Sequence, residues 1–179
     1  KINGVLDREL SLYLKLLEHN YIKKITFIDY GDINSKKILK KYSNKFDHIS
    51  LIDYSKKNLL YKSSLIKLFI VFKNLINIDY NQIDIIKTKQ FKGAFIALII
   101  KYLYKIKVII RFGYDPIHFY RGYFKKLYFF YVNFVFKKSD FIIYTELNSN
   151  ETISLINELN YKSIKINNFV DQNIFSKKK

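Results

Sequence analysis

Two short polar segments contain the residues best suited to binding an anionic or hydroxyl-bearing ligand. The segment Arg111-Phe112-Gly113-Tyr114-Asp115 follows an apolar run rich in β-branched residues and precedes a long helical pattern. Its arginine, one of three in the chain, can place a planar guanidinium on a phosphate or a carboxylate. Asp115 can orient a hydroxyl group, and Lys89 and Gln90, after another apolar run, can hydrogen-bond ligand hydroxyls. The residue types suit a ligand that carries phosphate or carboxylate together with hydroxyl groups.

Each of these residues also has a structural alternative. For Arg111 it is an ion pair with Asp115 or Glu146, and for Asp115 it is the capping of a turn. Glu146 either binds a ligand or supports the helix predicted after Thr145. The chain has no cysteine, which excludes disulfides and thiolate metal sites, and no other cluster has metal-ligand spacing. No nucleophile–base pair is evident either.

Glycines recur where predicted strands meet predicted helices. Gly31, Gly93 and Gly113 each follow a β-branched run, and Gly4 stands just before the first predicted helix. Turns of this kind gather at one edge of an open parallel sheet, where ligands bind, although any α/β fold needs some glycine in its turns. At a helix N-terminus the backbone N–H of Gly4 suits a phosphate. Their recurrence predicts a binding cleft.

Hydrophobic periodicity supplies the elements that must position these residues. Short apolar runs alternate with helical patterns, which is typical of βα units in a mostly parallel sheet. The predicted fold class is therefore α/β, with a Rossmann-like, mostly parallel sheet, helices on both faces and the first strand upstream of Lys1. No Gly/Ser linker marks an internal boundary. Strands are expected at residues 25–28, 48–52, 84–87, 107–110, 141–144 and 163–166. Asn3 or Asp7 is expected to cap a first helix that reaches Leu17, and further helices are expected at 63–76, 93–104, 118–138 and 148–159. Asn148, with Glu151 three residues later, forms a capping box for the last of these helices.

Charge adds a constraint on partners. The 179 residues carry a net charge of +17, with lysine heavily dominant among the basic residues. Frequent Lys, Ile and Asn are what an AT-rich genome encodes, so part of the basicity reflects composition alone. Residues 85–139, however, hold twelve Lys or Arg and a single acid. Such a region suits phosphate-bearing ligands, anionic lipid or nucleic acid.

One predicted helix, residues 118–138, combines ten Phe or Tyr residues with five basic ones. Three interpretations remain open: a helix buried on the sheet, an interfacial segment among anionic headgroups, and a nucleic-acid-binding surface. For the interfacial case Tyr123, Lys125 and Lys126 are the expected membrane-facing residues. The uncharged stretch within this helix is too short to span a bilayer. The scarcity of arginine argues against nucleic acid.

Together with Arg111–Asp115, three further motifs resemble one enzyme family. They are Gly4-Val5-Leu6-Asp7-Arg8-Glu9-Leu10, the strand-and-Glu pattern ending at Glu146, and Asn168-Phe169-Val170-Asp171 followed by Phe175. In this order they resemble the N-terminal half of family 4 glycosyltransferases, which have the two-domain GT-B architecture. The resemblance covers essentially the whole chain.

The resemblance implies transfer of a sugar from a nucleotide-sugar donor to an acceptor hydroxyl, with retention of anomeric configuration and without a metal or other cofactor. Family members of this kind often build bacterial surface polysaccharide or glycolipid. Residues 1–170 would form the Rossmann-like acceptor-side domain, and residues 171–179 would start the linker to a C-terminal donor-binding domain that is absent here. Such a fragment is expected to be inactive alone.

The same resemblance assigns roles to the candidate residues. Gly4 would face the donor phosphates, and Asp115 would act in catalysis by orienting the acceptor hydroxyl. The residues expected to contact the acceptor are Lys89, Gln90, Arg111, Tyr114 and Glu146. The acceptor would be a glycan or lipid-linked molecule, and the enzyme would be cytoplasmic, peripheral at the inner face of an anionic membrane.

Two other classes of protein also fit the composition. One is a non-enzymatic basic α/β module that binds nucleic acid, a partner that the transferase interpretation does not expect. The other is an intact flavodoxin-like domain that needs no partner half. Tight binding of single-stranded RNA without vesicle binding would favour the first of these.

Overall fold

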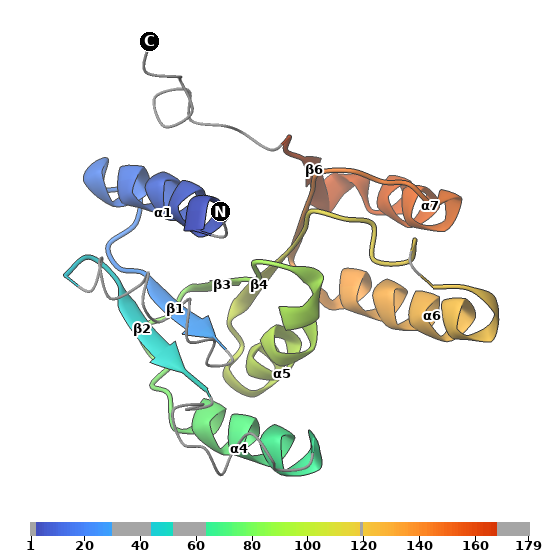
Figure 1. Cartoon of the computed structure of the whole chain (residues 1–179). Coiled ribbons are helices and arrows are strands. Elements are labelled where there is room, and N and C mark those ends of the chain that lie inside the picture. Colours follow the sequence, from blue (N-terminus) through green and yellow to red (C-terminus); the bar gives the residue numbers. More distant parts are fainter. Residues whose placement is uncertain (1–2, 30–43, 52–63, 119, 168–179) are drawn as a thin grey trace. The chain divides into compact units, whose positions relative to one another are not determined.

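A computed structural model describes residues 3–29, 44–51, 64–118 and 120–167 of the chain. The chain forms two compact units, one containing residues 1–79 with 170–179 and the other residues 80–169. Figure 1 traces the elements of both. The junction at Asp79 and Tyr80 has no Gly/Ser-rich composition, which is why the sequence shows no boundary there.

The first unit contains a short parallel strand pair and two described helices. Helices α1 (Asn3–Glu18) and α4 (Ser64–Ile76) accompany strands β1 (Thr26–Asp29) and β2 (Asp47–Ser50). The strands pair in parallel, with Thr26 opposite Asp47. A small core surrounds Leu10 and Phe46, and the Phe27 ring packs edge-on against those of Tyr13 and Phe46.

The second unit is a four-stranded, fully parallel sheet in the order β3-β4-β5-β6. The predicted α/β class with a parallel, Rossmann-like sheet is confirmed. The strands are β3 (Ile85–Lys87), β4 (Lys107–Phe112), β5 (Phe141–Tyr144) and β6 (Ser163–Lys165). They are connected through α5 (Ala94–Tyr104), α6 (Gly122–Lys138) and α7 (Asn150–Glu158), with the 3₁₀ turns η1 (Phe91–Gly93) and η2 (Asn160–Lys162).

All three helices of the second unit pack on one face of this sheet. In β4 the buried residues Val108, Ile110 and Phe112 alternate with less buried neighbours, as a strand covered mainly on one side requires. The same core cluster takes residues from α5, α6 and α7. Neighbouring parallel strands joined in chain order by right-handed crossovers place their helices on a single face, so this unit corresponds to one half of a doubly wound sheet.

Aromatic rings fill the centre of this core. Phe112 of β4 stacks on Phe136 of α6, with ring centroids 5.3 Å apart and planes inclined by 16°. Phe91 packs edge-on against both rings. Such pairs contribute about 0.5–1.5 kcal/mol beyond the burial of their area. The aromatic content of 118–138 thus has one explanation in the core.

Several predicted boundaries differ from the structure for local reasons. The helix expected from residue 118 begins at Gly122, because Ile117 N–H is held by the Asp115 side chain and Tyr120 N–H closes a turn onto the Ile117 carbonyl. Gly122 has φ +59°, a left-handed conformation that favours glycine. Strand β4 continues to Phe112, so Arg111 lies within the strand rather than in the turn.

Candidate functional site at the carboxyl edge of the sheet

Because the four strands of the second unit are parallel, the segments that follow them emerge at one edge. The segment after β3 carries Lys89 and Gln90, the segment after β4 carries Tyr114, and the segment after β5 carries Glu146. All four side chains are exposed, Tyr114 at 71%. Five of the predicted ligand-binding residues, counting Arg111 near the end of β4, therefore belong to this carboxyl edge.

Hydrogen bonds beyond the strand ends hold this edge in place. Thr88 N–H donates to the Ile109 carbonyl at 3.0 Å, and the Thr88 hydroxyl accepts from Arg111 N–H at 2.9 Å. On the other side of β4, Thr145 N–H donates to the Phe112 carbonyl at 3.3 Å. The backbone that carries Lys89, Arg111 and Glu146 is thus tied to the sheet. Sequence reasoning missed Thr88, whose only signal is its place directly after a β-branched run.

The Arg111 side chain lies on the sheet face opposite the helices. Alternation along β4 places it with Lys107 and Ile109, away from the core residues Ile110 and Phe112. It is half-buried, and its register partner in β5 is Ile143. Arg111 therefore lies near the carboxyl edge, on the face that α5, α6 and α7 do not cover.

Asp115 is a buried structural carboxylate. Its side chain is 1% exposed and accepts five hydrogen bonds from described residues. Oδ1 accepts from Ile117 N–H at 2.9 Å and from the Thr152 hydroxyl at 2.7 Å. Oδ2 accepts from the N–H groups of Asn148 and Ser149 at 3.0 and 2.7 Å and from the Ser149 hydroxyl at 2.7 Å. The carboxylate joins the loop after β4 to the start of α7.

The electrostatics of Asp115 follow from this network. Burial by itself raises a carboxyl pKa, but the hydrogen bonds from Thr152, Ser149, Ile117 and Asn148 stabilise the charged form and hold the Asp115 pKa below its ordinary value. A carboxylate with both oxygens occupied and almost no exposure is not placed to orient an acceptor hydroxyl. We therefore assign Asp115 a structural role in place of the catalytic one suggested by the sequence.

The start of α7 corrects a second prediction. The sequence suggests Asn148 as the N-cap with Glu151 three residues later, whereas the structure has Ser149 at this position. The Ser149 hydroxyl accepts from Thr152 N–H at 3.3 Å and donates to Asp115. Neither Ser149 nor Thr152 is recognisable from local sequence as a partner of Asp115, because they lie 34 and 37 residues away.

The remaining predicted residues lie elsewhere. Gly4 belongs to the first turn of α1, in the first unit, rather than to a loop before it. Lys125 forms an ion pair with Glu151 at 2.5 Å, while Tyr123 and Lys126 are exposed on α6. Gly31 and the motif from Asn168 to Phe175 lie outside the described residues.

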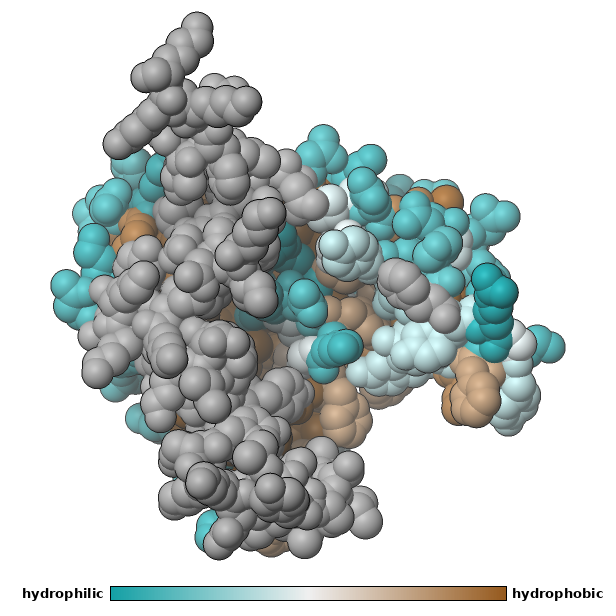
Figure 2. Space-filling model, in the orientation of Figure 1, coloured by the Kyte–Doolittle hydropathy of each residue, from teal (hydrophilic) through white to brown (hydrophobic). Residues whose placement is uncertain are grey.

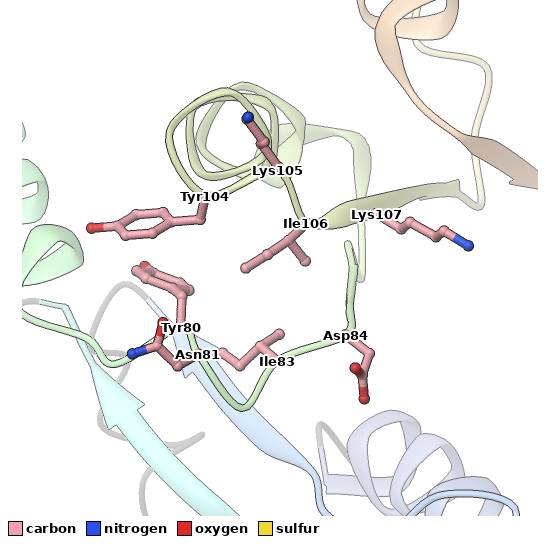
Figure 3. Close-up of a pocket in the computed structure, with 8 residues that line it drawn as sticks. All are labelled: Tyr80, Asn81, Ile83, Asp84, Tyr104, Lys105, Ile106 and Lys107. Atoms are coloured by element: carbon pink, nitrogen blue, oxygen red, sulfur yellow. The ribbon is translucent and has the colours of Figure 1, made fainter.

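A cavity of about 380 Å³ lies at the opposite, amino edge of the sheet, before β3 and β4 (Figure 3). The rings of Tyr80 and Tyr104 lie 4.3 Å apart on one side of it. Burial, followed by the proximity of Tyr104, raises the Tyr80 pKa to about 12. None of the predicted ligand-binding residues lines this cavity. It is lined by Tyr80, Asn81, Ile83, Asp84, Tyr104, Lys105, Ile106 and Lys107.

Within the described ranges, no three His, Cys, Asp or Glu side chains are grouped as a metal ion would require. In the same part of the chain, every helix falls short of the length and apolar character needed to cross a bilayer. The sequence matches no protein-family model and no curated protein.

Proposed function

We propose that this chain is the acceptor-side half of a retaining, nucleotide-sugar-dependent glycosyltransferase. The observation that carries the proposal is the gathering of Lys89, Gln90, Arg111, Tyr114 and Glu146 at the carboxyl edge of one parallel sheet. This is the edge at which open α/β sheets bind ligands. Amide, ammonium, guanidinium, phenol and carboxylate groups together suit the many hydroxyls of a sugar.

Each of these side chains would bind a different group of the ligand. Arg111 contributes a planar pair of donors to an acceptor phosphate or carboxylate. Lys89 and Gln90, which directly follow Thr88, donate hydrogen bonds to sugar hydroxyls, and Glu146 accepts hydrogen bonds from these hydroxyls. The exposed ring of Tyr114 provides an apolar surface beside the polar groups. The nucleotide-sugar would be held by a further domain, and Gly4 at the start of α1 would face its phosphates.

A glycan or lipid-linked acceptor for bacterial surface polysaccharide or glycolipid fits this arrangement. Lipid-linked acceptors are embedded in a membrane, so the enzyme would work at the cytoplasmic face of the bilayer. The association of the enzyme with this bilayer would be peripheral.

Substitution of Arg111 tests the proposal. The whole polypeptide encoded by the gene is incubated with labelled nucleotide-sugars and with lipid and polysaccharide extracts as acceptors, and transferred label is measured. Arg111→Ala should raise the acceptor KM and lower kcat/KM about tenfold or more, since a charged hydrogen bond contributes about 1.5–3 kcal/mol. The KM for the nucleotide-sugar should stay unchanged, because Arg111 is assigned to the acceptor.

Lys107→Ala is the matched control. Lys107 lies on the same strand and the same face but at the amino edge, and its loss also removes one positive charge. It should leave both KM values unchanged. Equal kinetics for Arg111→Ala and the unmodified protein would remove Arg111 from the site. A full-length protein that transfers no sugar would refute the proposed activity.

A further inference from the structure

Helix α6 carries large apolar side chains on the side that faces away from its own core. Tyr123, Leu127, Phe130 and Phe134 are spaced i, i+4, i+7 and i+11, which places them on one side of a helix. They are 77%, 58%, 67% and 54% exposed. We call these four residues the outer stripe of α6.

The opposite side of the same helix is fully packed. Val132, Val135 and Phe136 have no exposed surface and belong to the core of the second unit. Because α6 already buries one apolar side, the outer stripe is not needed for folding of this unit. A helix that is apolar on both sides is otherwise found inside large proteins or in membranes.

Helix α5 extends the exposed apolar surface. It contacts α6 directly, and it exposes Phe95 at 49%, Tyr102 at 87% and Leu103 at 55%. Figure 2 shows hydrophobic residues in brown at the surface over α5 and near the right-hand end of α6. Exposed apolar surface gathered on neighbouring helices marks an interaction site.

The charges around the outer stripe are positive. Lys126 and Lys138 are exposed beside it, and Arg121 is exposed just before the helix. The nearby acids are already engaged: Glu151 pairs with Lys125, and Glu158 with Lys137 at 3.7 Å. Both pairs join α6 to α7. The outer stripe is thus bordered by cations, while the acids lie toward α7.

We propose that the outer stripe of α6, with the exposed residues of α5, docks on the surface of an anionic phospholipid bilayer. The apolar side chains would enter the headgroup and acyl boundary, and the lysines would contact lipid phosphates. Tyrosine and lysine are suited to this boundary, because each has an apolar body and a polar tip. The two-sided pattern explains why a helix too short to span the bilayer still exposes so many aromatic rings.

A second copy of the chain fits this surface less well. A symmetric dimer would bring the same patch of each protomer together and would place Lys126 and Lys138 against like charges. An anionic lipid surface complements both the apolar stripe and its cationic border. The docking face rests on the membrane location in the proposed function, and it can be tested without measuring sugar transfer.

Vesicle co-sedimentation tests the docking face. The chain is mixed with vesicles of phosphatidylcholine alone or of phosphatidylglycerol with phosphatidylcholine, and the bound fraction is measured. We expect binding to the anionic vesicles, weakened by salt. The double variant Phe130→Ser/Phe134→Ser should bind about tenfold more weakly or worse. Lys126→Glu should reduce binding by about fivefold or more, since one cation near such a surface contributes about that factor.

Helix α4 offers matched controls. Phe69→Ser changes a phenylalanine that is 70% exposed, close to the value for Phe130, and Lys73→Glu reverses the charge of an exposed lysine. Both should bind as the unmodified chain does, and circular dichroism should show all variants folded. Equal losses in the α4 and α6 variants would overturn the docking face.

Three other results would also overturn it. One is absence of binding to anionic vesicles, and another is equal binding to both vesicle types at every salt concentration. The third is sedimentation equilibrium showing a dimer that Phe130→Ser/Phe134→Ser dissociates without changing vesicle binding. Loss of vesicle binding with sugar transfer to a soluble acceptor retained would separate the docking face from the acceptor site.

Discussion

Two regions of the second unit reverse the usual distribution of polar and apolar side chains. At Asp115 a charged group is buried, and along the outer stripe of α6 four large apolar groups are exposed. The buried carboxylate accepts five hydrogen bonds from described residues, whereas folding of the unit does not require the stripe. A buried charged group whose hydrogen bonds are all made within the protein indicates a structural role. Exposed apolar side chains that the core does not need indicate a surface for a partner.

The largest expected effect is on the buried side of this comparison. Asp115→Asn replaces one carboxylate oxygen by an amide NH₂, which would face a backbone N–H in a buried site. We expect a loss of about 3 kcal/mol or more in the free energy of unfolding, because charged hydrogen bonds are lost and a donor is left unpaired. Urea unfolding followed by circular dichroism measures it.

Asp84→Asn is the control for that substitution. Asp84 is an exposed aspartate of the same unit, and its amide should change the free energy of unfolding by no more than about 0.5 kcal/mol. A small effect of Asp115→Asn, similar to that of Asp84→Asn, would show that the buried network contributes little and would weaken the contrast with the stripe.

The pH dependence of stability should sharpen the same comparison. The Asp115 pKa is lowered in the folded state, so its contribution is present above the unfolded value of about 3.9 and is lost as pH falls through the folded pKa. When the pH is lowered from neutral into the acid range, the free energy of unfolding should therefore fall less for Asp115→Asn than for the unmodified protein. Parallel stability–pH curves for the two proteins would contradict this assignment.

The smallest expected effect belongs to the exposed side. Phe130→Ser should change the free energy of unfolding by no more than about 0.5 kcal/mol, because the ring is mostly in solvent and leaves no cavity. Urea unfolding of the chain without vesicles tests this. A loss of several kcal/mol in the free energy of unfolding would mean that the outer stripe is packed in a core. The contrast between a buried Asp115 and an exposed stripe would then fail.

Local patterns predicted most of the fold. The strand at 141–144 agrees with β5 residue for residue, and the other five strands shift by a few residues at their ends. β-branched runs are short-range signals, and their alternation with helices is sufficient to predict a parallel sheet. The parallel sheet in turn placed Lys89, Gln90, Tyr114 and Glu146 at one edge.

Predictions that depended on particular partners were less successful. The N-cap of α7 was expected at Asn148 but is Ser149, and Gly4 was expected in a loop but belongs to α1. Asn and Ser are nearly equal as caps, so the choice between neighbours depends on the hydrogen bonds available. At Ser149 those bonds include one to Asp115, far away in sequence.

The order of hydrophobic residues by itself determined the alternation of strands and helices, because the periods of helix and strand are set by each residue's neighbours in the chain. Tertiary structure alone decided that Asp115 is buried and which side of α6 faces the core. Phe and Tyr occur around the whole circumference of α6, so helical periodicity does not distinguish Phe136 from Phe130. Burial distinguishes them, since Phe136 meets Phe112 of β4 across the core and Phe130 points away from it.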